Sequence, residues 1–195
     1  ENWKKQYKPF RLGRHMVVKP GWETFDAQPD DKIIEIDPGM AFGTGTHETT
    51  GMCVELIEDY VKPGDTAIDI GTGTGILAIA AMHMGAQDAL AIDIDRVAVR
   101  VAAENVRING FADVIRTRQG DLLQAVDERA NVVIANIIAD VIAMLAQPVR
   151  AHIEDGGLFI CSGIARERSD FVIEALKAAG YQQPMDIREK GEWMA

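Results

Sequence analysis

The chain is poor in cysteine, in positive charge and in long apolar runs. Only two cysteines, Cys53 and Cys161, occur among its 195 residues. They lie far apart, in apolar surroundings, without the Cys-x-x-Cys spacing of zinc and redox sites. We therefore expect two buried free thiols in a reducing cytoplasm, and neither a disulfide nor a metal site. No apolar stretch reaches the roughly 20 residues that a membrane-spanning helix needs.

Basic residues are outnumbered, with 20 Lys and Arg against 30 Asp and Glu and a formal net charge of -10. An acidic surface repels phosphate backbones, so a large nucleic-acid interface is not expected, whereas a basic protein partner would suit it. Hydrophobic residues make up 47% of the chain, which is ordinary for a globular domain. The chain begins with Glu1 instead of Met, and we expect it to be part of a longer protein.

After Val61, short apolar runs alternate with helical stretches. This alternation predicts βαβ units, that is, a doubly wound, mostly parallel α/β sheet with helices on both faces. A terminal antiparallel hairpin is expected to follow. Strands are predicted at 66–70, 89–94, 114–118, 132–135 and 157–163, helices at 75–84, 95–108, 139–153 and 166–179, and the hairpin at 183–195.

Two strand-like segments precede this core, at 14–19 and 32–37. They predict a short ribbon that leads into the stretch DPGMAFGTGTHETT at 37–50. A helix with one apolar face is expected over 49–61, between this stretch and the first core strand.

The stretch AIDIGTGTGILAIAA at 67–81 places a glycine-rich loop between a strand and a helix. Open parallel sheets bind ligands at this end of their strands, and glycines such as Gly71 and Gly73 let the backbone approach a ligand closely. The nicotinamide fingerprint G-x-G-x-x-G/A requires a small residue where this chain has Ile76. The spacing G-x-G-x-G after Asp69 resembles instead that of S-adenosylmethionine-dependent methyltransferases, in which the loop passes under the amino-acid end of the cofactor.

Two more carboxylates follow the next strands. Asp93 closes the strand in AIDID and can accept hydrogen bonds from both ribose hydroxyls. Asp121, in QGDLL, is placed to reach the adenine amino group, although a helix N-cap explains it almost as well. A tight turn alone would explain the two glycines of the loop but not the ordered set of three carboxylates. The predicted cofactor is therefore S-adenosyl-L-methionine.

The stretch at 37–50 lacks the Lys of a Walker motif, and we interpret it as a lid over the same pocket. Its glycines allow bending, Phe42 supplies apolar cover, and Thr46 and Thr50 supply hydroxyl groups. For His47, contact with a substrate and a role in holding the loop are both open, because no partner makes it a base. The two glycine stretches are thus predicted to face one ligand from opposite sides.

The lid stretch and VIANIIADVI at 133–142 carry a specific resemblance to the ribosomal protein L11 methyltransferase family, PrmA, which extends over nearly the whole chain. The resemblance implies a class I, Rossmann-like methyltransferase fold. It implies methylation of lysine and N-terminal amino groups on a protein of the large ribosomal subunit, in the cytoplasm. It also implies cofactor contacts by Thr50, Gly71, Asp93 and Asn136.

The resemblance further implies how the chain is divided. Residues 1–45 would form a linker and the ribbon that leads into the lid, and residues 46–195 the catalytic domain. The N-terminal substrate-recognition domain of the family would lie outside this chain. Asn131 stands where an Asp is expected at the start of the fourth core strand, a change with no obvious catalytic meaning.

Asn136 is the predicted catalytic residue. Its side-chain carbonyl, or a neighbouring backbone carbonyl, can accept a hydrogen bond from an amine and aim the nitrogen lone pair; a helix N-cap is the structural alternative. Related glutamine and adenine amino methyltransferases carry Asn-Pro-Pro-Tyr here. This chain has Asn-Ile-Ile-Ala, which lacks the stacking aromatic and favours an aliphatic amine. Three alternatives remain. The methyl acceptor could be another protein, RNA or a small amine; the chain could be a nicotinamide oxidoreductase; or it could be an inactive adenosyl-binding module.

Overall fold

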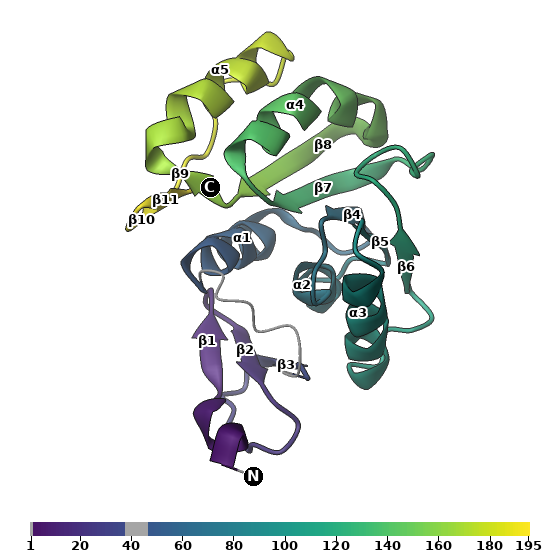
Figure 1. Cartoon of the computed structure of the whole chain (residues 1–195), viewed down its shortest axis with the longest axis vertical. Coiled ribbons are helices and arrows are strands. Elements are labelled where there is room, and N and C mark those ends of the chain that lie inside the picture. The colour runs from purple at the N-terminus through teal and green to yellow at the C-terminus, as the bar shows by residue number, and fades with distance from the viewer. Residues whose placement is uncertain (1, 38–46) are drawn as a thin grey trace.

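A five-stranded parallel sheet forms the centre of the structure, a computed structural model that describes residues 2–37 and 47–195 (Figure 1). The strand order is β6-β5-β4-β7-β8, and every neighbouring pair is parallel. The order reverses between β4 and β7, which makes their carboxyl ends the topological switch point. The strands are β4 (Thr66–Ile70), β5 (Asp88–Asp93), β6 (Ile115–Gln119), β7 (Ala130–Asn136) and β8 (Ile153–Ser162).

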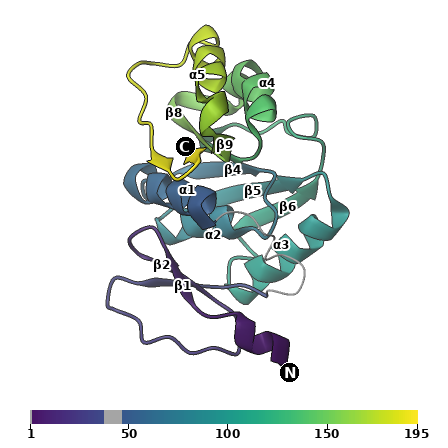
Figure 2. The same cartoon turned by 60° about the vertical axis from the view of Figure 1, so that its left-hand side comes forward.

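Helices cover both faces of this sheet (Figures 1 and 2). The first three α-helices lie on one face and the last two on the other, which confirms the predicted doubly wound α/β fold. The helices are α1 (His47–Tyr60), α2 (Ile76–His83), α3 (Arg96–Ile108), α4 (Ala139–Val149) and α5 (Ser169–Ala178), with short 3-10 helices η1 (Asn2–Gln6), η2 (Arg150–His152) and η3 (Arg166–Arg168).

The core has two layers because successive strand residues point to opposite faces. Ala67 and Ala91 belong to the cluster that packs against α1 and α2. Ile68 and Ile92, each the next residue along its strand, belong to the cluster that contains Leu145 of α4. The sequences of these strands are therefore nearly continuous apolar runs, as expected for a sheet that is buried on both sides. Within the described ranges, no helix combines the length and apolarity needed to cross a membrane.

The N-terminal ribbon lies beside α1 and contains one strand more than predicted. Its strands are β1 (Phe10–Leu12), β2 (Met16–Lys19) and β3 (Lys32–Glu35). β1 pairs antiparallel with β2, whereas β2 and β3 are parallel. The buried carboxylate of Glu58 in α1 accepts hydrogen bonds from the backbone amides of Arg14 and His15, at 2.7 and 2.6 Å. These bonds fix the turn between β1 and β2 to the helix.

The C-terminal part differs from the predictions in its boundaries. β8 begins at Ile153 and not at the predicted residue 157, because the glycine-containing segment before 157 is an irregularity within the strand, where Gly156 has φ +77°. The terminal hairpin, β10 (Glu189–Lys190) and β11 (Trp193–Met194), is antiparallel as predicted. It pairs with β9 (Ile164–Ala165) in a separate three-stranded sheet and not with the central sheet.

Candidate functional site

The predicted glycine loop connects β4 to α2 at the switch point. Its three glycines all have positive φ, +69° at Gly71, +56° at Gly73 and +84° at Gly75, a region that side chains other than glycine rarely adopt. A Cβ on Gly71 would lie 2.9 Å from Cγ2 of Ile137, whereas a Cβ on Gly73 would meet no described atom within 4 Å. The loop is thus packed on one side against the segment after β7 and open at Gly73.

Asp69 lies under this loop and is buried, with 1% of its surface exposed. Its Oδ2 accepts a hydrogen bond from the Thr72 hydroxyl at 2.7 Å, and its Oδ1 has no partner among the described atoms. Burial raises the pKa of Asp69 from 3.8 to about 7. Hydrogen bonds from the Thr72 hydroxyl and the Ala78 amide lower this pKa, and the negative charge of Asp93 raises it further. Through the hydrogen bond with Thr72, the buried carboxyl group stabilises the conformation of the loop.

Asp93 ends β5 and reaches across to the loop. Its Oδ2 accepts a hydrogen bond from the backbone amide of Gly73 at 2.9 Å, and its Oδ1 accepts one from the amide of Asp95 at 3.0 Å. Asp95, the first residue of the predicted helix, caps α3, since its side chain accepts from the amide of Val97 at 2.9 Å. Asp93 is half-buried, so the carboxylate that holds the loop is also partly accessible.

Asn136 ends β7 and contacts Thr50 in the first part of α1. The Asn136 Nδ2 donates a hydrogen bond to the Thr50 hydroxyl oxygen at 3.3 Å. The structural alternative for Asn136 is wrong, because the N-cap of α4 is Ile138. Two predicted site residues that are remote in sequence thus meet at the carboxyl edge of the sheet, next to the segment that packs on Gly71.

Asn105 in α3 is a residue that the sequence interpretation missed. It is fully buried, its Nδ2 donates to the carbonyl of Thr74 in the glycine loop at 2.9 Å, and its Oδ1 accepts from the amide of Asp37 at 3.1 Å. One turn later, the Asn109 side chain accepts a hydrogen bond from the amide of Glu35 and donates one to its carbonyl. The only available signal was two asparagines four positions apart on one face of a helix.

The remaining predicted residues are not brought into this group. Asp121 is exposed in a turn after β6, and no helix begins there, so the N-cap alternative is wrong. Phe42 and Thr46 lie outside the described residues, and so does the side chain of His47. Asn131 lies at the opposite end of the sheet, where it exchanges hydrogen bonds with Thr66.

The geometry suits a ligand with both polar and cationic parts. The loop offers backbone groups at Gly73, where it is open, while Asp93 and Asn136 offer side-chain oxygens and Thr50 a hydroxyl. The described residues contain no cluster of three or more His, Cys, Asp or Glu able to hold a metal ion. The backbone amides, hydroxyl and side-chain oxygens at the switch point can hydrogen-bond to hydroxyl, amino and carboxylate groups of a ligand.

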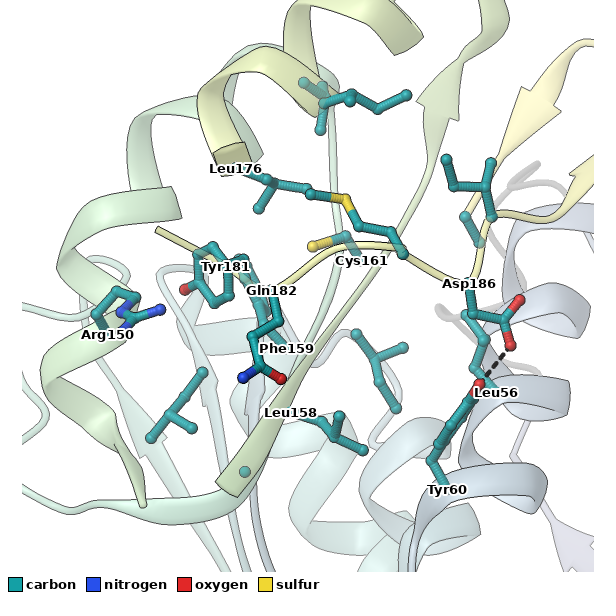
Figure 3. Close-up of a pocket in the computed structure, with 18 of the residues that line it drawn as sticks. Leu56, Tyr60, Arg150, Leu158, Phe159, Cys161, Leu176, Tyr181, Gln182 and Asp186 are labelled. Carbon is teal, nitrogen blue, oxygen red and sulfur yellow. Dashed lines mark hydrogen bonds between the residues drawn. The ribbon is translucent and has the colours of Figure 1, made fainter. Parts of the chain in front are cut away.

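A separate hollow of about 670 Å³ lies along β8, α5 and the tail that follows α5 (Figure 3). Apolar side chains such as Leu158 and Leu176 line it, and the Tyr60 hydroxyl donates to Asp186 at 2.6 Å on its rim. Its lining includes none of the predicted site residues. The hollow is therefore distinct from the site at the switch point.

Comparisons with known proteins show the family of the chain. The family model described as ribosomal protein L11 methyltransferase (PrmA) matches residues 1–195. A protein named ribosomal protein L11 methyltransferase from Pelotomaculum thermopropionicum is 51% identical over 193 residues, which are 99% of this chain and 62% of that protein. The chain thus spans about three fifths of the length of such curated relatives.

Two solved structures are also similar. The crystal structure of ribosomal protein L11 methylase from Lactobacillus delbrueckii subsp. bulgaricus matches with a TM-score of 0.88 and 35% identity, over 96% of this chain and 95% of that one. A methyltransferase from Pyrococcus furiosus matches in fold, with a TM-score of 0.68 and 18% identity, over 83% of this chain and 84% of that one. The fold is that of class I S-adenosylmethionine-dependent methyltransferases, and the chain belongs to the ribosomal protein L11 methyltransferase (PrmA) family.

Proposed function

We propose that this chain transfers methyl groups from S-adenosyl-L-methionine to lysine and N-terminal amino groups of ribosomal protein L11. The observation that carries the proposal is the contact between Asn136 and Thr50 beside the glycine loop. It puts a carboxamide and a hydroxyl at the switch point, where sheets of this class bind ligands. The name of the relatives that are about half identical supports the substrate.

The residues at the switch point fit the methyl donor. The backbone at Gly71 and Gly73 would face its amino-acid end, and Asp93 would accept from its ribose hydroxyls. Thr50 would contribute a hydroxyl, and Asp121 would reach the adenine amino group. When bound, S-adenosyl-L-methionine supplies a methyl group on a positively charged sulfur. In the proposed set, Phe42 would supply apolar cover from the lid, Thr46 a hydroxyl group, and Asp69 support beneath the loop.

Asn136 would act on the acceptor amine. A free lysine amine has a pKa of about 10.4 and must lose a proton before it can attack. A dry site disfavours the ammonium form, and the proton can leave to water. Because Nδ2 of Asn136 is engaged by Thr50, its Oδ1 would accept from an amine N–H and direct the lone pair. Alignment of this kind can lower a barrier by several kcal/mol, with an upper range of about 7–11.

Substrate recognition is assigned to a different part of the protein. We propose that residues 46–195 are the catalytic domain and that residues 1–45 link it to a recognition domain outside this chain. The greater length of the relatives, of which the chain covers 62%, supports a further part of the protein outside this chain. A cytoplasmic location follows from the proposed ribosomal substrate. The net charge of -10 favours contact with a basic protein over direct contact with RNA.

Mass spectrometry of L11 tests this function. The protein in its full natural length is incubated with S-adenosyl-L-methionine and L11, and methyl groups are mapped to lysine side chains and the N-terminus. We expect Asn136→Ala to lower kcat by about two orders of magnitude, as for the loss of an aligning group. Asn131→Asp is the matched control, because Asn131 contacts Thr66 at the opposite end of the sheet, and its rate should equal that of the wild type. Methylation of RNA but not of L11 would contradict the proposal.

A further inference from the structure

Ser162 ends β8 beside Asn136, its partner in the register of β7 and β8. It is fully buried, and its hydroxyl donates a hydrogen bond to the carbonyl of Thr49 at 2.7 Å. Its own carbonyl accepts from the amide of Ile137 at 3.1 Å. Ser162 is therefore bonded to the residue before Thr50 and to the residue after Asn136.

Gly163 supplies the space that the Asn136 side chain needs. It has φ +83°, and a Cβ at this position would lie 2.9 Å from Oδ1 of Asn136 and 2.8 Å from the carbonyl oxygen of Ile137. Real Cβ atoms are not found this close to backbone oxygens. A side chain at position 163 would therefore displace the carboxamide or the backbone that carries it.

The contact between Asn136 and Thr50 depends on this support. Its length of 3.3 Å is near the outer limit for a hydrogen bond of this type, so a small shift of the first turn of α1 would break it. The bond from Ser162 to Thr49 is shorter, at 2.7 Å, and also ties that turn to the sheet. A buried hydroxyl bonded in this way gives the turn a defined distance from β7.

We propose that Ser162 and Gly163 are positioning residues that hold the Asn136 carboxamide in the orientation used for methyl transfer. This inference rests on the proposed function. Ser162 acts through Thr49 on Thr50, and Gly163 acts directly on the space around Asn136. Neither residue contributes a side-chain group to the donor or the acceptor.

The test compares Ser162→Ala with the wild type in kinetics and in NMR. We expect the side-chain amide resonances of Asn136, assigned with Asn136→Ala, to shift or broaden in Ser162→Ala. We expect kcat to fall about tenfold with the KM for L11 changed less than about twofold, because binding of the acceptor is untouched. In an Asn136→Ala background, Ser162→Ala should lower kcat no further, since coupled residues are not additive.

Two matched controls separate positioning from fold stability. Thr66→Val removes a hydroxyl hydrogen-bonded to Asn131 at the far end of the sheet, and should lower stability without changing kcat. Gly156 has a positive φ of +77°, so alanine is as strained there as at Gly163, but no described atom lies within 4 Å of its Cβ position. We expect Gly163→Ala to disturb the Asn136 resonances and kcat, and Gly156→Ala to disturb neither.

The outcomes are distinct. Unchanged Asn136 resonances and unchanged kcat in a destabilised Ser162→Ala variant would overturn the proposal. Rate losses that multiply in the double variant would overturn it as well. If Asn136→Ala retains the wild-type kcat, the proposed function of Asn136 fails, and the resonances of its side chain still decide whether Ser162 and Gly163 position it.

Discussion

The carboxylate of Asp93 and the backbone amide of Gly73 are joined by a hydrogen bond of 2.9 Å. This bond connects the end of β5 to the loop after β4, and a second one, from the amide of Asp95 at 3.0 Å, connects it to the start of α3. Each carboxylate oxygen has a further lone pair that could accept from a hydroxyl. The residue proposed to hold the ribose is thus also the residue that shapes the loop.

Alanine at two of the three loop glycines, Gly71 and Gly73, is expected to separate effects on folding from effects on ligand binding. Both positions have positive φ, which costs a residue with a Cβ about 1–2 kcal/mol. Gly71→Ala adds a contact of 2.9 Å with Ile137, so its total loss of unfolding free energy should be larger, about 2–4 kcal/mol. Gly73→Ala lacks that contact, yet its methyl group projects into the space proposed for the ligand. Urea unfolding and ligand titration of each variant measure the two effects.

Gly110→Ala is the control for these variants. Gly110 has φ +80° and no described atom near its Cβ, and it follows α3 outside the site. It should lose as much stability as Gly73→Ala and keep the wild-type affinity. Equal affinity in Gly73→Ala and Gly110→Ala would show that position 73 does not face the ligand.

The ligand-free chain should lose stability as the pH rises from about 4 to about 7, because of Asp69. Its pKa is raised from 3.8 to about 7 in the folded state, so across this range the folded chain retains a proton that the unfolded chain has released. At about 1.4 kcal/mol per pKa unit, the loss is at most about 4 kcal/mol. Asp69→Asn, which keeps an acceptor for Thr72, should remove this component. Urea unfolding at pH 5 and pH 8 measures it, and parallel pH profiles for variant and wild type would contradict it.

Asn105→Ala should destabilise the chain by about 2–3 kcal/mol. It removes the hydrogen bond to the carbonyl of the half-buried Thr74 and the one from the amide of Asp37, each worth about 0.5–1.5 kcal/mol, and it leaves a void where the fully buried side chain packs. Arg107→Ala, on an exposed position of the same helix, is the control and should change stability by less than about 0.5 kcal/mol. Thermal unfolding of both variants is the measurement, and equal midpoints would exclude a bridging role for Asn105.

The two thiols should be unreactive in the folded chain. Cys53 and Cys161 are free and buried, as predicted, and burial raises the pKa of both thiols. Because the thiolate is the reactive species, an aromatic disulfide reagent should modify neither at neutral pH, and both after unfolding in urea. Rapid modification of one thiol in the native chain would mean that this part of the core opens readily.

Local patterns in the sequence were enough to predict the elements of the sheet. β4 was predicted with its observed bounds, because an apolar run ends there at a glycine loop, and the bounds of α3 were predicted to within one residue. The strand β1 was missed because three residues carry no periodicity. Asn105 and Ser162 were missed because their roles depend on partners that are remote in sequence, Asp37 and Thr49. The bulge at Gly156 has the composition of a turn, and only the pairing of β8 with β7 reveals it as part of the strand.

Isothermal titration of the chain with S-adenosylmethionine, S-adenosylhomocysteine and NAD is the most direct test of the proposed site. Both adenosyl compounds should bind and NAD should not, and Asp93→Ala should weaken binding about a hundredfold, as for two lost hydrogen bonds to a charged group. Asp95→Ala removes the cap of α3 but leaves Asp93 in place, and should lower stability by about 1 kcal/mol with unchanged affinity. Failure of the folded chain to bind either adenosyl compound, or equal affinity of Asp93→Ala and the wild type, would contradict the site.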